Sequence, residues 1–195
     1  MNWLYNNWYK FTAPLALLIS IPLFTKTYHE DFPLFLIWLQ TVVYLIHQFE
    51  EYILPGGFVK FFNHNLLNSQ YDDQPLDKVA SFWINIPIIF VAFPISAYLA
   101  GAIDLSFGVW TAYFSIINAA SHVGMSFKYK YNPGLVVSAL LNIPFGIYTL
   151  YYFTTNQLVS TQVHLIGFLI GLTIQGSLMI YGFKILKKRA SVINH

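Results

Sequence analysis

The chain has 195 residues, of which 56% are hydrophobic, 19% are aromatic and only 9% are charged. Soluble domains carry roughly a quarter charged residues, so this composition excludes a disordered chain and a water-soluble globule. The net charge of +2 and the absence of cysteine exclude a nucleic-acid-binding protein, a disulfide framework and thiolate metal ligands. We therefore expect an integral multi-pass protein of the cytoplasmic (plasma) membrane, with the lipid bilayer as its surroundings.

Six stretches of the chain have the length of about 20 mostly apolar residues that a helix needs to cross a bilayer. The first has an aromatic leader and no small-residue cleavage box, so we expect a retained helix rather than a signal peptide. The sequence thus predicts an all-α membrane protein, a single domain over residues 1–195 built as a bundle of about six transmembrane helices. The predicted spans are approximately 8–25, 32–54, 79–103, 105–127, 134–153 and 162–186.

The basic residues indicate how such a bundle is oriented. With six spans, nine of the ten lysines and arginines lie on the same side as the termini, and Lys26 lies on the opposite side. Because cytoplasmic connections are enriched in lysine and arginine, both termini are expected to be cytoplasmic. The longest connection, 55–78, lies on the same side and carries His64. It is long enough to fold back over the cytoplasmic mouth of the bundle.

The second predicted span carries ionisable side chains where they are energetically expensive. In a helix, Glu50 and Glu51 lie on either side of His47 within one turn, and Tyr44 extends this face toward the middle of the membrane. The alternative is that the glutamates belong to a helix end and reach water. A histidine with two acids on one membrane-embedded face favours a functional site.

The fourth predicted span adds Asn118 and His122, which are four residues apart and share a helix face. Alone, this pair could form a hydrogen bond between helices. Counted at 1.5 Å per residue, however, His47, Glu51 and His122 all lie roughly 5–10 Å inside the cytoplasmic ends of their spans. We therefore expect one shared site, with the His47 and His122 rings facing each other across two helices.

These motifs resemble those of the HXXEE family of small multi-helix membrane proteins. The segment His47-Gln-Phe-Glu50-Glu51 is similar to the pattern that names the family, and Asn118-Ala-Ala-Ser-His122 is similar to its second motif. The segment 132–134 (Asn-Pro-Gly) is similar to a later Pro-Gly element. The resemblance extends from about the second to the fifth span. It implies that five residues act as one unit, namely His47, Glu50, Glu51, Asn118 and His122, and it implies no substrate.

Imidazole and carboxylate groups suit zinc, iron and manganese. Two histidines and one glutamate with an open position for water are typical of catalytic zinc sites. The expected ligands of a divalent metal, zinc above iron or manganese, are His47, His122 and Glu51. His64, in the long connection, is a candidate extra ligand.

Three functions stay open. We favour a metal-dependent hydrolase or lyase for a lipid-like or amphipathic substrate at the inner leaflet, with Glu50 as the general base and Asn118 or Tyr44 orienting His122 or polarising a carbonyl. The second is a metal-free acid–base enzyme, an intramembrane protease or isomerase, in which the two glutamates share a proton. The third is a non-enzymatic proton or ion carrier or sensor. Stoichiometric metal in the purified protein would separate the first function from the others.

Overall fold

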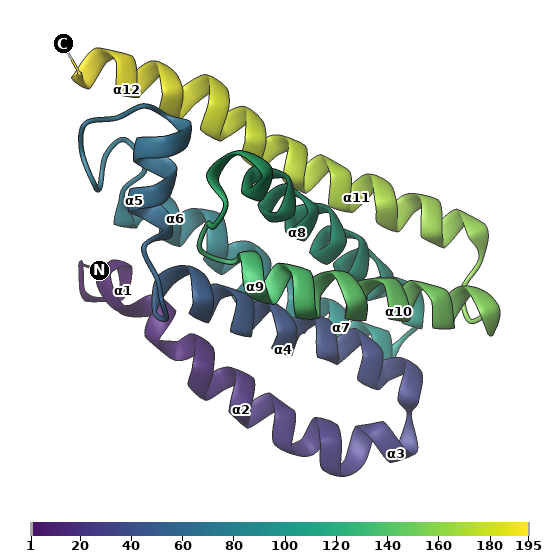
Figure 1. Cartoon of the computed structure of the whole chain (residues 1–195). Coiled ribbons are helices and arrows are strands. Elements are labelled where there is room, and N and C mark those ends of the chain that lie inside the picture. The colour runs from purple at the N-terminus through teal and green to yellow at the C-terminus, as the bar shows by residue number, and fades with distance from the viewer. Residues whose placement is uncertain (1, 195) are drawn as a thin grey trace.

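The computed structural model describes residues 2–194, and every regular element in that range is helical (Figure 1). Most helical rods combine α-helix with a short 3-10 or π-helical stretch. The first two rods lead from the N-terminus to the long connection. They comprise α1 (Asn2–Asn7), η1 (Trp8–Phe11), α2 (Thr12–Pro22), η2 (Leu23–Thr27) and α3 (Tyr28–Glu30), followed by α4 (Phe32–Tyr52).

The rest of the chain forms one short rod in the long connection and four longer ones. The short rod is α5 (Phe58–Phe61) with η3 (Phe62–Leu66). The others are α6 (Lys78–Asn85), η4 (Ile86–Ala92) and α7 (Phe93–Ala102); α8 (Val109–Tyr129), preceded by η5 (Leu105–Phe107); α9 (Leu135–Val137), η6 (Ser138–Asn142) and α10 (Ile143–Thr155); and α11 (Thr161–Ile180), η7 (Tyr181–Leu186) and α12 (Lys187–Ile193).

Local sequence explains where several of these elements begin and widen. Pro87 lies within η4, and Pro144 is the second residue of α10, just after η6. A proline has no N–H to bond the carbonyl one turn earlier, so the helix widens locally there. Aspartates begin two rods, because Asp31 accepts a backbone N–H at 3.0 Å at the start of α4 and Asp77 accepts one at 2.7 Å at the start of α6.

Five rods are long and apolar enough to cross a membrane, which indicates a membrane protein. They run over Trp3–Glu30, Phe32–Tyr52, Lys78–Ala102, Leu135–Thr155 and Thr161–Ile193. They correspond to five of the six predicted spans. The remaining prediction, 105–127, forms the 21-residue helix α8. The helix α8 is long enough to cross a membrane, but its polar residues make it less apolar than the five candidate spans. The number of spans therefore stays a prediction.

The helix α4 lies at the centre of the bundle, between α2 and the α9–α10 rod (Figure 1). In its apolar 18-residue stretch, 67% of the residues are buried, against 17–28% in the corresponding stretches of the other four candidate spans. The helix α8 packs against α4, α10 and α11. A Cβ atom on Gly171 of α11 would lie 2.9 Å from the Phe114 backbone nitrogen, so α11 and α8 approach closely at this glycine. Interior faces of α4 and α8 are therefore shielded from lipid and can carry polar side chains.

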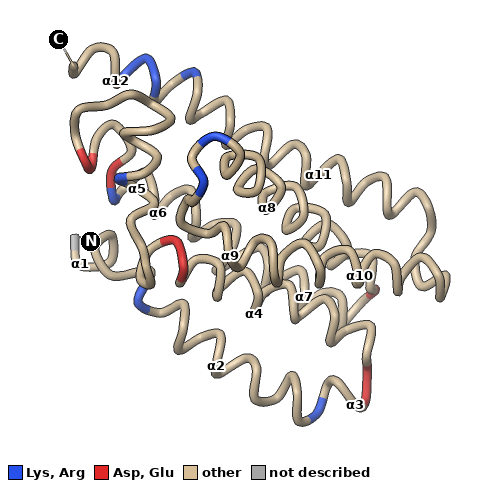
Figure 2. Tube along the Cα trace, viewed as in Figure 1, with Lys and Arg blue, Asp and Glu red and all other residues tan. Residues whose placement is uncertain are grey.

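The charged residues divide the bundle into two different ends. Lysine and arginine gather at the end that holds both termini, on α5, α12 and the end of α8 (Figure 2). Lys26 lies at the opposite end, where its Nζ is 3.9 Å from the Glu30 carboxylate. We call the end with both termini the basic end.

The orientation predicted from this bias can be checked with topology reporters. A reporter fused after His195 should score as cytoplasmic, and a reporter inserted between Lys26 and Asp31 should score as outside, since basic flanks are retained in the cytoplasm. Activity of alkaline phosphatase and green fluorescent protein fusions gives the measurement. The reverse pattern would place the basic end in the outer leaflet and contradict the prediction.

The long connection folds back over the basic end, as the sequence predicts. Asn63 holds it together: its Nδ2 donates to the carbonyls of Asp72 (3.1 Å) and Leu76 (2.9 Å), and its Oδ1 accepts from the Leu76 backbone N–H at 2.9 Å. Leu76 also packs with Leu186 of the last rod in a small apolar cluster. The last rod thereby fixes the connection against the mouth of the bundle.

Candidate metal centre

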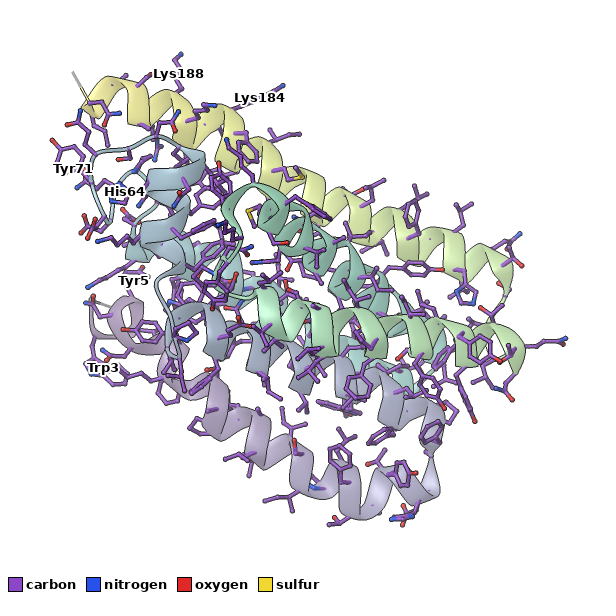
Figure 3. All side chains as sticks on the ribbon, in the orientation of Figure 1. Trp3, Tyr5, His64, Tyr71, Lys184 and Lys188 are labelled. Carbon is purple, nitrogen blue, oxygen red and sulfur yellow. The ribbon has the colours of Figure 1, made fainter. Side chains whose placement is uncertain are left out.

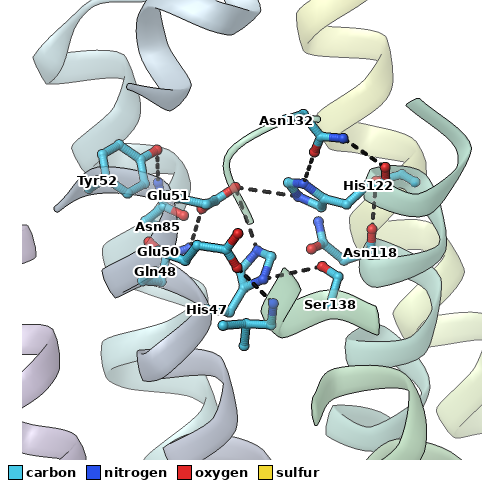
Figure 4. A network of polar contacts seen from close by, with 12 residues as sticks. His47, Gln48, Glu50, Glu51, Tyr52, Asn85, Asn118, His122, Asn132 and Ser138 are labelled. Carbon is cyan, nitrogen blue, oxygen red and sulfur yellow. Dashed lines mark hydrogen bonds and ion pairs between the residues drawn. The ribbon is translucent and has the colours of Figure 1, made fainter. Parts of the chain in front are cut away.

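Three ionisable side chains meet inside the bundle near the basic end (Figure 4). His47 and Glu51 are one turn apart on α4, and His122 lies on α8. The Glu51 Oε1 atom is 3.5 Å from the Nε2 atom of His47 and 3.4 Å from the Nε2 atom of His122. The two imidazole centroids are 4.8 Å apart. Each residue is at most 5% exposed, and one ligand atom from each lies within 4.8 Å of the others, so the group could hold a metal ion.

These separations fit a shared cation better than direct hydrogen bonds. A charge-assisted N–H···O bond measures about 2.7–2.9 Å between heavy atoms. In a tetrahedral site with metal–ligand bonds of about 2.0–2.1 Å, neighbouring ligand atoms are roughly 3.3–3.4 Å apart. The Nε2–Oε1 distances of 3.5 Å and 3.4 Å lie close to that second value. The donor set also matches zinc, which binds imidazole nitrogen and carboxylate oxygen.

Hydrogen bonds to the far side of the rings set the protonation of the nitrogens. Asn132 Oδ1 lies 2.7 Å from His122 Nδ1, and Asn132 Nδ2 donates to the His122 carbonyl at 2.9 Å. An amide oxygen only accepts, so Nδ1 of His122 carries the proton and the Nε2 of the neutral ring presents a lone pair to Glu51. His47 Nδ1 lies 3.3 Å from Ser138 Oγ, and its buried Nε2 has no hydrogen-bond partner among residues 2–194. The Ser138 hydroxyl can donate or accept, so this contact does not fix the tautomer of His47. When Nδ1 carries the proton in both rings, two imidazole lone pairs and a carboxylate oxygen converge.

The contact between Asn132 and His122 gives a direct prediction. Asn132→Ala should weaken zinc binding about 10- to 100-fold, because the ring loses the acceptor that fixes its tautomer and orientation. Asn132→Asp keeps an acceptor opposite Nδ1 and should retain most of the affinity. Zinc titration against a competing chelator measures both variants. Equal affinities for the wild type and Asn132→Ala would contradict this role.

Gly134 closes one side of the group. Its φ is +96°, and a Cβ atom there would lie 2.8 Å from His47 Cε1, 2.9 Å from His122 Cε1 and 3.0 Å from Glu51 Cγ. Backbone in this conformation strongly favours glycine, and the three contacts leave no room for a side chain. The segment 132–134 therefore supplies both the hydrogen-bond partner of His122 and a close-fitting backbone cover.

Glu50 makes its hydrogen bonds with Tyr131 and the start of α9 rather than with His47 or Glu51. Its Oε1 accepts from the Tyr131 hydroxyl and the Val136 backbone N–H, both at 3.1 Å, and its Oε2 accepts from the Val137 N–H at 2.7 Å. Desolvation and the Glu50 carboxylate raise the pKa of Tyr131 to about 12, so its hydroxyl stays a donor at neutral pH. A carboxylate at a helix N-terminus also interacts favourably with the helix dipole. The role of Glu50 as general base stays a prediction, while its contacts anchor the start of α9 beside Gly134.

Glu50→Gln tests this anchoring role. The amide keeps one acceptor and turns an N–H₂ toward a backbone donor, so the free energy of unfolding should fall by roughly 1–3 kcal/mol. Zinc content should stay near that of the wild type, because Glu51 is untouched. Tyr131→Phe removes one donor alone and should cost less. A Glu50→Gln variant as stable as the wild type would show that these contacts do not anchor the helix.

Other predicted residues lie around the group with separate contacts. Tyr44 packs against the His47 ring at a centroid distance of 5.1 Å and stacks on Phe114 at 5.5 Å. Asn118 donates to Gln175 Oε1 at 3.1 Å and so links α8 to α11. The structure thus places both next to the group, Tyr44 beside one ring and Asn118 one turn from His122.

The structure does not bring His64 to the buried group. His64 lies in η3 of the long connection, with its Nε2 2.6 Å from Asp72 Oδ1, while Lys60 Nζ is 3.0 Å from Asp72 Oδ2. Hydrogen bonds from His64 and Lys60 hold the pKa of the Asp72 carboxyl below its usual range. Figure 3 shows His64 at the basic end, within the long connection. The imidazole is thus paired at the surface, away from the position expected for an extra ligand.

A cavity of about 500 Å³ reaches the group from one side. Glu51 and His122 form part of its wall, and most of the remaining wall is aromatic and aliphatic, including Phe58 and Phe62 of the long connection. The volume falls within the range of small-molecule sites. An open coordination position at Glu51 and His122 would therefore face a mainly apolar chamber.

Four residues around the group had no role in the sequence interpretation. Gln48 Nε2 donates to the second carboxylate oxygen of Glu51 at 3.0 Å, and the other three residues belong to the segment that enters α9 and η6. The Asn-Pro-Gly sequence at 132–134 was a signal without an assigned contact, whereas a single serine in an apolar helix gives none. The four are Gln48, Asn132, Gly134 and Ser138.

A family model described as "Protein of unknown function with HXXEE motif" matches residues 38–149. The chain belongs to the HXXEE family. The matched part includes His47, Glu51, His122 and the 132–134 segment, so the resemblance predicted from the motifs is confirmed. No curated protein and no solved structure matches the chain.

Proposed function

We propose that this HXXEE protein is a membrane-embedded, metal-dependent hydrolase or lyase for a lipid-like substrate in the leaflet at its basic end. The observation that carries the proposal is the buried group of His47, Glu51 and His122, with Nε2–Oε1 separations of 3.5 Å and 3.4 Å. With neutral rings, a Glu51 oxygen that faces two imidazole lone pairs would be costly in the interior, although Gln48 donates to the other oxygen. A divalent cation bound by all three groups removes that cost.

Zinc is the ion we assign to the site. The ligands would be His47 Nε2, His122 Nε2 and the Glu51 carboxylate, which is the two-histidine, one-glutamate set of catalytic zinc sites with a position left open. When bound, zinc polarises a substrate carbonyl and lowers the pKa of water. The cavity wall at Glu51 and His122 lets a substrate approach this position from the apolar side.

The protein's own groups hold the site in place for hydrolysis. Asn132 and Ser138 orient the two rings, and Gln48 holds the second oxygen of Glu51. Glu50 anchors the start of α9 through three accepted hydrogen bonds, so we give it a positioning role in this proposal. In the hydrolytic form of the reaction, water adds to an acyl carbon, the acyl bond breaks, and the alcohol or amine leaves with the proton.

The test begins with metal content. The protein purified in detergent without added chelator should contain about one zinc per chain, and X-ray absorption at the zinc edge should show nitrogen and oxygen neighbours at about 2.0–2.1 Å. Reconstituted protein should then cleave one member of a panel of long-chain esters and amides, and a chelator should abolish the cleavage. Protein that stays free of metal when incubated with zinc, iron or manganese would overturn the proposal in favour of a proton-sharing pair.

A further inference from the structure

The wall of the cavity shows which kind of molecule fits it. Apart from the ligand residues and a few amides, aromatic and aliphatic side chains from α4, η3, η4, α8 and α11 surround the space. Phe58, whose ring centroid is 5.9 Å from the His122 ring, closes it toward the long connection. Burial of a hydrocarbon chain against such a surface is favourable by roughly 25 cal/mol for each Å² of apolar surface removed from water.

One side of the cavity is separated from the outside of the bundle by a thin wall. Ile84 and Ile88 from the α6–η4 segment, with Leu178 and Tyr181 from the α11–η7 segment, line the cavity and also line a groove on the outer surface. The groove continues over Trp83, which is 61% exposed. Asp77 and Arg189 also line the groove, while the wall that the groove shares with the cavity consists of Ile84, Ile88, Leu178 and Tyr181.

The cavity also has a charged side chain at its basic end. Lys128, near the end of α8, is the one lysine or arginine among the described residues of the cavity wall. Its Nζ lies 4.9 Å from the centroid of the Tyr129 ring. A cation beside an apolar chamber at the membrane interface favours a ligand that combines a chain with a negative headgroup.

We propose that the cavity binds a single-chain lipid with an anionic headgroup, which enters from the bilayer between α6–η4 and α11–η7 and places its headgroup at Lys128. The hydrocarbon chain lies against the apolar wall, and the bond between chain and headgroup lies near Glu51 and His122. This rests on the proposed function for the reaction, of which such an acyl ester or acyl amide would be the substrate. The lipid site itself stands on the cavity and on Lys128.

The experiment uses the full chain in nanodiscs and a 16-carbon fatty acid that carries a photoreactive diazirine and a terminal alkyne. Gly124 lines the cavity, and a Cβ atom there meets no other atom within 4 Å, so Gly124→Leu adds a bulky side chain at the cavity wall without a clash at Cβ. Gly176 on α11 has equally open surroundings and is not part of the cavity wall, which makes Gly176→Leu the matched control. Labelled peptides are identified by mass spectrometry.

Gly124→Leu should reduce labelling of the cavity wall at least about fivefold, because the side chain occupies the volume that the chain needs. Gly176→Leu should label like the wild type. Lys128→Gln should reduce labelling by the acid about threefold or more, while labelling by the matching fatty alcohol should not change. Equal labelling of the wild type and Gly124→Leu, or labelling confined to the outer faces of the helices, would overturn the lipid site. An equal loss of the acid and alcohol labels in Lys128→Gln would overturn the assignment of the headgroup.

Zinc content measured on the same samples separates the two proposals. About one zinc per chain with labelling that Gly124→Leu does not reduce would overturn the lipid site and support the metal centre. Labelling that Gly124→Leu removes, in protein that binds no metal, would support the lipid site and overturn the metal-dependent reaction.

Discussion

His47→Ala and His122→Ala are each expected to reduce bound zinc from about one ion per chain to less than about a tenth. Each substitution removes one of the three proposed ligands, whose atoms lie within 4.8 Å of one another. Glu51→Gln should have a comparable effect, since it removes the negative charge that offsets the cation in a buried site. Metal analysis of the purified variants, with the melting temperature recorded before and after chelation, provides the measurement.

The protein contains matched histidine controls for this experiment. His64 is paired with Asp72 in the long connection, and His164 contacts Tyr113 at 3.1 Å between Oη and Nδ1, away from the buried group. His64→Ala and His164→Ala should keep the zinc of the wild type. A loss of zinc in His64→Ala equal to that in His122→Ala would contradict the assigned ligand set.

Gly134→Ala should have the second largest effect, although it changes no ligand. Its Cβ atom would lie within 3.0 Å of the side chains of His47, His122 and Glu51, on backbone with φ of +96°. The variant must either shift the 132–134 segment, with loss of the Asn132 contact to His122, or displace the rings. We expect zinc affinity to fall at least about 100-fold and the free energy of unfolding to fall by roughly 1–3 kcal/mol.

Gly57→Ala isolates the backbone contribution. Gly57 has φ of +90°, and a Cβ atom there meets no other atom within 4 Å. It should therefore show the strain of a positive φ without any effect on zinc. Zinc titration and thermal unfolding of the two variants separate the effect of backbone strain from the effect of contact with the buried group. If Gly134→Ala binds zinc like Gly57→Ala, the cover over the group is not close enough to matter.

Local sequence determined the membrane-protein class and the content of the α4 face. A chain with 9% charged residues is apolar enough for lipid, where a helix pairs its backbone N–H and C=O groups within one segment. The spacing of His47 and Glu51 is four residues, so any helix puts them on the same side. The two motifs were sufficient to identify the HXXEE family, which the match over residues 38–149 confirms.

The partner of each side chain depended on the tertiary structure. Glu50 and Glu51 are adjacent in sequence, but one turns toward the backbone of α9 and the other toward His122, because they point in directions about 100° apart on the helix. His64 could reach the mouth of the bundle by chain length alone, yet Asp72 in the same connection pairs with it. Sequence spacing does not specify which of several polar groups becomes the nearest neighbour.

The convergence of α4, α8 and the 132–134 segment was likewise a matter of packing. Periodicity places His122 on a face of α8 but does not say which helix that face meets, and the structure shows that α8 packs against α4, α10 and α11. The close approach of Gly134 depends on a positive φ and on the absence of a side chain, which a sequence permits but does not require. The sequence by itself determined the helices and the types of side chain that could bind a metal. Only the packing of distant helices brought two imidazoles and one carboxylate to a common point. That position depends on contacts between residues 47, 122 and 134 rather than on the conformational preference of any one segment.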